Sequence, residues 1–180
     1  MKRREEPIRI KGGALSFRFS RREGKEGKGM DPIYRLLVFV HVFSAILGMG
    51  PGFYLTALAK SAKNMTELRH AFALRHKLHV YVMIGGTLLL VTGLSMGFLN
   101  RGLFRAGWYW TSLALYLIAL AMGPFVLSPR TKPIKRLLAS HKGEEIPEEY
   151  EKLAKSLFRA EYLENFIFLV IIALMIAKPF

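Results

Sequence analysis

The chain has 180 residues, 52% of them hydrophobic, with a formal net charge of +14 and no cysteine. Its apolar residues form long blocks instead of the periodic pattern of a water-soluble domain, which excludes a soluble globular fold. The lack of cysteine excludes disulfides, thiol catalysis and zinc–thiolate sites. In a membrane protein this positive charge indicates basic loops beside anionic lipid, so the lipid bilayer is the expected partner and nucleic acid is not.

The first 29 residues carry ten basic residues and lack the central apolar stretch of a signal peptide. The letters KEGKG directly before Met30 are what a purine-rich ribosome-binding site would encode if it were translated by mistake. We therefore favour Met30 as the biological start, with the membrane domain at residues 30–180. The alternative for residues 1–29 is a disordered basic tail, which their glycine, lysine and arginine content also fits.

Four apolar blocks approach or exceed the length of about 18–20 residues that a helix needs to cross a bilayer. They cover residues 33–59, 79–99, 107–127 and 162–177. The blocks are long and do not alternate between polar and apolar residues, which favours helices over barrel strands. The predicted fold is therefore all-α, a polytopic membrane protein built as a four-helix transmembrane bundle.

Small residues recur at helical spacing in the first block. Ser44, Gly48 and Gly52 are four residues apart and form a stripe on which a second helix can pack closely. Pro51 removes a backbone donor and is expected to kink this helix. Small residues also recur in the next two blocks, at Gly86, Gly93 and Gly97 and at Ser112, Ala119 and Gly123.

His41 lies on the same face as this stripe, several turns inside the first block. An ionisable side chain at that depth indicates a functional site. One interpretation is an axial ligand of haem b, with Met96 or Met175 on the opposite side, and another is a hydrogen-bonding group in a ligand cavity. A third is a neutral imidazole hydrogen-bonded across the seam to Ser44 or Ser112.

The segments between the blocks are basic and polar. In the first loop we expect a short helix after Asn64, with Thr66 as its cap. The third loop is expected to begin at Pro129. A helix should restart near Pro147 and run into the fourth block, because glutamates and lysines four residues apart support it.

A second group of polar residues lies at the other end of the blocks. HKLH places His76 and His79 three residues apart, and EYLE does the same for Glu161 and Glu164. Residues at this spacing share a helix face, so two imidazoles and two carboxylates could converge. Such ligands suit a divalent transition metal, and the same groups could relay protons.

The alternative for this group is ordinary boundary chemistry, in which the glutamates pair with Arg75 or Arg159. His41 lies about 17 residues, or roughly 25 Å, from the end of its helix that should be level with His79. One ion or one haem iron is therefore not expected to bind both histidines.

Lysine and arginine are unevenly distributed between the loops. The first and third loops are strongly basic, whereas the second loop and the C-terminus carry few basic residues. The positive-inside rule therefore predicts that the first and third loops are cytoplasmic and that the N- and C-termini are outside.

Four short motifs carry a family resemblance: LLVFVHVFSAILGMGPG, the pairs Thr92–Gly93 and Gly107–Trp108, and the closing LMIAKP. They resemble a family of prokaryotic predicted integral membrane proteins of unknown function, which implies four spans. More distantly, His41 and the small residues after it are similar to the membrane-bound protoporphyrinogen oxidase and copper-resistance protein D families. The first of these implies a b-type haem and a redox role in the cytoplasmic membrane.

The standard catalytic motifs of hydrolases, P-loop proteins and zinc proteases do not occur in this chain, so whether it is an enzyme stays open. The leading hypothesis is a small haem- or cofactor-binding redox-type protein that uses His41. A second is a proton- or metal-coupled transporter working through the His/Glu group as a homo-oligomer. A third is a non-catalytic adaptor whose basic loops hold lipid or a partner.

Overall fold

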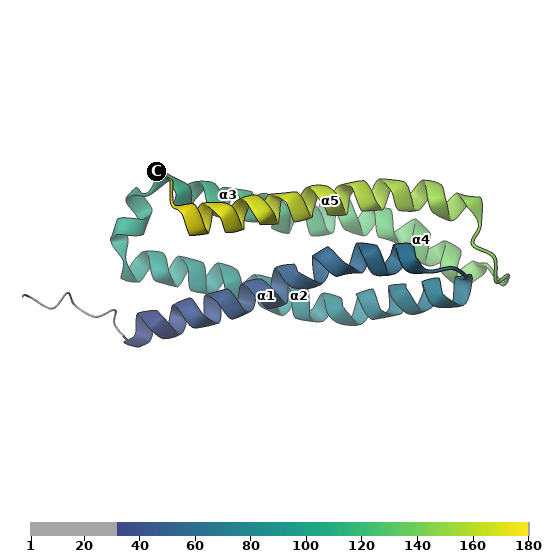
Figure 1. Ribbon diagram of the computed structural model, residues 1–180, viewed down its shortest axis with the longest axis horizontal. Helices are drawn as coiled ribbons and strands as arrows, with labels where there is room; N and C mark the ends of the chain where they lie inside the picture. The colour runs from purple at the N-terminus through teal and green to yellow at the C-terminus, as the bar shows by residue number, and fades with distance from the viewer. Residues whose placement is uncertain (1–31, 180) are drawn as a thin grey trace, which may run out of the picture.

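The computed structural model describes residues 32–179, and every regular element in that range is helical (Figure 1). Four continuous helical segments are long and apolar enough to cross a membrane, which confirms the all-α, four-span prediction. The predicted tail at residues 1–29 lies outside the described residues. The elements are α1 (Pro32–Ser61), α2 (Met65–Leu99), the 3-10 helix η1 (Arg101–Arg105), α3 (Gly107–Met122), the π-helix η2 (Gly123–Leu127), α4 (Ser128–Ser140) and α5 (Glu148–Ala177).

The helices extend well beyond the predicted spans. The expected first loop is almost entirely helical, because α2 begins at Met65, with Asn64 and not Thr66 as its cap; the Asn64 side chain accepts a hydrogen bond from the Glu67 N–H at 2.8 Å. The expected third loop does not begin at Pro129, since the helix continues to Ser140. The restart after Pro147 is confirmed, and α5 is one unbroken helix.

The π-helix explains how the third segment continues through a glycine–proline pair. In η2 the Ser128 N–H donates to the carbonyl of Gly123, five residues earlier. A widened turn of this kind accommodates the ring and the missing donor of Pro124 without ending the helix. The segment therefore runs from α3 through η2 into α4 as a single candidate span, Gly107–Ser140.

The bundle consists of two pairs of helices, α1 with α2 and α3 with α5 (Figure 1). The first pair is exceptionally close where Gly48 meets Gly85, because a Cβ on Gly85 would lie only 2.5 Å from the Gly48 nitrogen. The two pairs diverge toward the end where α1 begins, which we call the open end. They converge toward the end that contains α4, which we call the closed end (Figure 1).

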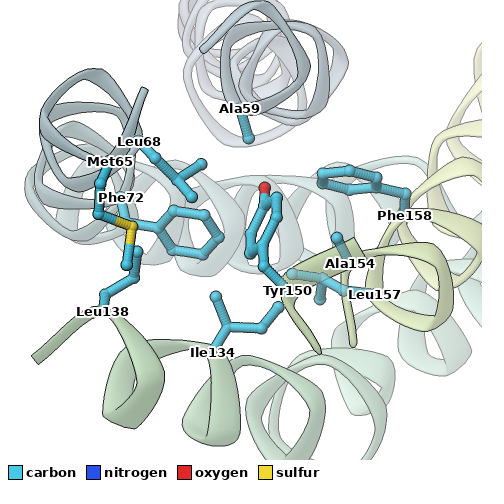
Figure 2. Close-up of a cluster of buried hydrophobic side chains, with 10 residues drawn as sticks. All are labelled: Ala59, Met65, Leu68, Phe72, Ile134, Leu138, Tyr150, Ala154, Leu157 and Phe158. Carbon is cyan, nitrogen blue, oxygen red and sulfur yellow. The ribbon is translucent and has the colours of Figure 1, made fainter. Parts of the chain in front are cut away.

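The closed end has a complete hydrophobic core of its own. The Tyr150 ring lies at its centre, with its hydroxyl directed toward Ala59 of α1, and Ile134 of α4 is fully buried beneath it (Figure 2). This core forms because the helical extensions turn their apolar side inward and their charged side outward, as in a water-soluble bundle. Its buried members are Ala59, Met65, Leu68, Phe72, Ile134, Leu138, Tyr150, Ala154, Leu157 and Phe158.

Candidate functional site

Three side chains from three helices form a buried polar cluster near the closed end, which we call the polar latch: Thr56, Arg75 and Glu161. Both nitrogens at the tip of Arg75 contact the Glu161 carboxylate, and the Thr56 hydroxyl donates to it at 2.6 Å. The side chains of Arg75 and Glu161 are only 14% and 8% exposed. The latch therefore ties α1, α2 and α5 together where the two helix pairs converge.

One turn further along α5, Asn165 adds a second link to α1. Its Nδ2 donates to the carbonyl of Gly52 at 3.2 Å, and a Cβ on Gly52 would lie 3.0 Å from the Asn165 Oδ1. Gly52 therefore makes room for α5, whereas Gly48 makes room for α2. The predicted stripe of small residues on α1 serves two different neighbours.

The four predicted metal ligands are not assembled into one site. His76 and His79 are exposed on α2, while Glu161 is buried in the polar latch and Glu164 is half-buried on α5. Within residues 32–179, no three His, Asp or Glu side chains are grouped so that they could hold a metal ion. Glu161 is paired with Arg75, as the boundary interpretation predicted.

A cavity of about 490 Å³ lies between the helix pairs on the side of the open end. Its wall is almost entirely apolar and includes residues of all four long helical segments, such as Met49, Leu89, Leu113 and Ile171. The polar side chains that line it are His41, Tyr109, Ser112 and Tyr116. A largely apolar cavity with a few converging polar groups is the usual form of a small-molecule site between the helices of a bundle.

The cavity opens toward the membrane between α1 and α5. Ile46 of α1 and Ile176 of α5 both line it, and these side chains are 65% and 78% exposed on the outer surface of the bundle. A molecule dissolved in the lipid could therefore enter sideways between these two helices.

His41 is held at the wall of this cavity by α2. Its Nδ1 lies 2.9 Å from the hydroxyl oxygen of Thr92, and its ring packs over Gly93, where a Cβ would meet the His41 Cε1 at 3.3 Å. The predicted partners Ser44 and Ser112 are wrong, because Ser44 instead donates to the Val40 carbonyl of its own helix. Thr92 is the residue that orients the imidazole.

The other polar groups of the cavity wall differ in whether their hydrogen bonds are satisfied. Tyr109 and Tyr116 donate across the gap to the carbonyls of Gly93 and Gly86, at 3.1 and 2.7 Å, and so connect α3 to α2. Ser112 is completely buried, and its hydroxyl has no hydrogen-bond partner among the described residues. A buried hydroxyl without a partner is uncommon in proteins and requires an explanation.

The predicted haem ligands are only partly brought together. His41 and Met175 line the same cavity, on α1 and α5. Met96 is not among the residues that line the cavity. His41 and Met175 are residue types that can ligate haem iron, but none of the described residues that line the cavity is a lysine or arginine that could pair with the two propionates of a haem.

Sequence reasoning missed Thr92, Gly85 and the two bridging tyrosines. Thr92 carried a detectable signal, since it is a polar residue inside an apolar run at the same depth as His41. Gly85 is next to the predicted packing residue Gly86, and spacing alone could not separate the two. Nothing in the sequence indicated which helix the tyrosines would reach.

Comparison with known proteins places the chain at the level of a family. A family model described as "Predicted integral membrane protein (DUF2269)" matches residues 35–179. No protein with a curated description matches the chain, and neither does any solved structure.

Proposed function

The chain belongs to the DUF2269 family of predicted integral membrane proteins, and from this premise we propose that it binds one lipophilic small molecule in the cavity beside His41. One observation carries the proposal: an apolar cavity open to lipid has on its wall an imidazole that α2 holds in a fixed position. Packing alone does not require a polar ring in an apolar wall, because an aliphatic side chain could fill the same position without burying a polar group, and an ionisable side chain inside a membrane span indicates a functional site.

Haem b is the second candidate ligand. The positions of His41 and Met175 on the wall of one cavity favour it, since these residue types form an axial pair in haem proteins. The lack of a lysine or arginine in the wall argues against it, because two buried carboxylates would lack partners. A neutral lipophilic ligand therefore ranks first.

We place the protein in a prokaryotic cytoplasmic membrane, with the closed end in the cytoplasm and both termini outside. The basic residues of the closed end support this orientation. A groove of about 330 Å³ between α2 and α4, lined by Arg69, His76 and Lys135 beside apolar residues, favours the phosphate of an anionic lipid as partner. Transport through the His/Glu group, assembly into homo-oligomers and an adaptor role stay predictions.

The test compares a variant that fills the cavity with a matched control. Gly50 lines the cavity at an exposed position of α1, and a Cβ there would have no neighbour within 4 Å, so Gly50→Phe adds a ring at the margin of the cavity without displacing backbone. Gly123 has equally open space but does not line the cavity, so Gly123→Phe is the control. Both proteins are purified in mild detergent, and bound small molecules are measured by native mass spectrometry and by absorption.

We expect a lipophilic molecule to co-purify with the wild type and with Gly123→Phe, and to fall at least about tenfold in Gly50→Phe, because the new ring occupies its space. A Soret band that disappears in Gly50→Phe and in His41→Ala would identify the ligand as haem. Equal occupancy in Gly50→Phe and Gly123→Phe would refute the cavity as the binding site.

A further inference from the structure

We propose that the cavity selects a neutral ligand whose polar head is a hydroxyl, such as a phenol, a hydroquinone or a long-chain alcohol; this rests on the proposed function. The inference comes from the hydrogen-bonding state of the groups on the wall. Two of these groups, His41 and Ser112, can each make a further hydrogen bond. Together they match a ligand group that can both donate and accept.

The hydrogen bonds of Thr92 determine which nitrogen of His41 carries the proton. A threonine hydroxyl has one hydrogen, and Thr92 directs it to the Leu88 carbonyl at 2.7 Å. The carbonyl can only accept, so the Thr92 oxygen accepts from His41 Nδ1–H at 2.9 Å. In the neutral ring the proton is then on Nδ1, which leaves Nε2 as an acceptor.

Among the described residues, the side-chain hydrogen bond of His41 runs through Nδ1, and the backbone group beside the ring is the Leu89 carbonyl, which can only accept. In the tautomer with the proton on Nδ1, the lone pair of Nε2 is left for a ligand. A ketone, an ester or an ether could not satisfy it, because these groups only accept. A hydroxyl can donate to it. The tautomer fixed by α2 therefore favours hydroxyl heads over carbonyl heads.

Ser112 supplies the complementary group. Ser112 lines the same cavity, and its hydroxyl has no hydrogen-bond partner among the described residues but is fully covered, so its side chain has to turn to meet a ligand. The hydroxyls of Tyr109 and Tyr116 already donate to α2 carbonyls. A ligand hydroxyl that donates to Nε2 can accept from Ser112, and this would satisfy both protein groups at once. A buried hydroxyl without a partner destabilises the protein, and binding of this kind would supply the missing hydrogen bond.

The rest of the wall excludes a charged head. Of the residues at 32–179, no Asp, Glu, Lys or Arg lines the cavity, so a carboxylate, phosphate or ammonium would enter without a counter-charge. The apolar walls and the lateral opening between Ile46 and Ile176 leave room for a hydrocarbon tail that extends into lipid. A neutral amphiphile with one hydroxyl satisfies all of these features.

Two probes that differ only at the head test the inference. We use 4-nonylphenol and its methyl ether, 4-nonylanisole, with the full chain in lipid nanodiscs, and we measure affinity by native mass spectrometry titration. The phenol is expected to bind about tenfold or more tightly than the ether, since one neutral hydrogen bond is worth about that factor. Ser112→Ala and His41→Phe should each reduce this preference to about twofold or less, with little change in affinity for the ether.

Ser44→Ala is the matched control, because Ser44 is equally buried but bonds within α1 and does not line the cavity, so the preference should survive. Thermal melting of each variant in the nanodisc confirms that it is folded. Equal affinity for the two probes in the wild type, with both displaced by Gly50→Phe, would overturn the hydroxyl preference and leave the proposed function standing. Binding of either probe that Gly50→Phe does not weaken would overturn the proposed function itself.

Discussion

Removal of one partner from the polar latch should destabilise the whole bundle. Glu161→Leu removes the ion-pair partner of the buried Arg75 guanidinium and leaves Glu164 as the carboxylate that still interacts with it, and Arg75→Met leaves the Glu161 carboxylate without its counter-charge. The double variant removes both charges and replaces them with apolar side chains of similar length. The latch joins α1, α2 and α5, so its loss should loosen the convergence of the two helix pairs and not only the local contact.

Burial decides the expected magnitude. Exposed ion pairs contribute only about 0–1 kcal/mol, but the two side chains here are 14% and 8% exposed. At the 3.4 Å between Arg75 Nη1 and Glu161 Oε2, the gross attraction is about 5 kcal/mol for an effective dielectric constant near 20. Breaking such a pair from one side costs about 3–5 kcal/mol, whereas replacing both partners is close to neutral. We expect each single variant to lose about 3 kcal/mol and the double variant to lose about 0–2 kcal/mol.

The assay is reversible unfolding in mixed micelles, followed by the fluorescence of Trp108 and Trp110 and analysed as a double-mutant cycle. Lys60→Met is the control, because Lys60 also bridges α1 and α5, through the Tyr162 hydroxyl at 2.7 Å, but at an exposed position. It should cost less than about 1 kcal/mol. Additive single variants that each cost no more than Lys60→Met would refute the role of the latch.

Three further predictions concern packing and lipid. Gly85→Ala should cost about 1–3 kcal/mol in the same unfolding assay, because its Cβ would meet the α1 backbone at 2.5–2.9 Å; an unchanged stability would show that the helix pair can separate freely. Tyr150→Phe should be neutral or stabilise by up to about 1 kcal/mol, since the Tyr150 hydroxyl is buried without a partner, and a clear loss would contradict that geometry. His76→Gln combined with Lys135→Gln should reduce retention of phosphatidylglycerol over phosphatidylcholine in native mass spectrometry about threefold or more, whereas retention equal to wild type would exclude the groove.

The membrane core of this fold was predictable from the sequence, and the closed end was not. Long apolar blocks are nearly sufficient to locate the membrane spans, because a helix satisfies all of its backbone hydrogen bonds within one segment of the bilayer. The helical extensions of the closed end were predicted to be loops because they are rich in lysine and arginine. Their apolar residues nevertheless recur at helical spacing, as Leu68 and Phe72 do on α2 and Ile134 and Leu138 do on α4, and these meet in one core.

The sequence identified the candidate polar residues of a site more reliably than it identified the residues that they contact. His41 and Met175 do share a cavity, since depth along a helix can be counted from its ends. Spacing of three residues put His76 and His79 on one face of α2, but it could not show that this face is exposed. The bond from His41 to Thr92 depends on how α1 and α2 are rotated about their axes, and the contact of Gly48 with Gly85 sets that rotation.

The unequal ends of the bundle explain why a ligand site would form where it does. At the closed end a hydrophobic core and the polar latch fill the space between the helix pairs, so no room is left for a lipophilic molecule. At the open end the pairs diverge, and hydrogen bonds from Tyr109 and Tyr116 connect α3 to α2 across the gap. All three residues are on α3. The two tyrosines donate to α2 carbonyls, whereas the hydroxyl of Ser112 between them has no partner among the described residues. A molecule that fills this gap would add contacts between the helix pairs, so binding should raise the thermal stability of the bundle.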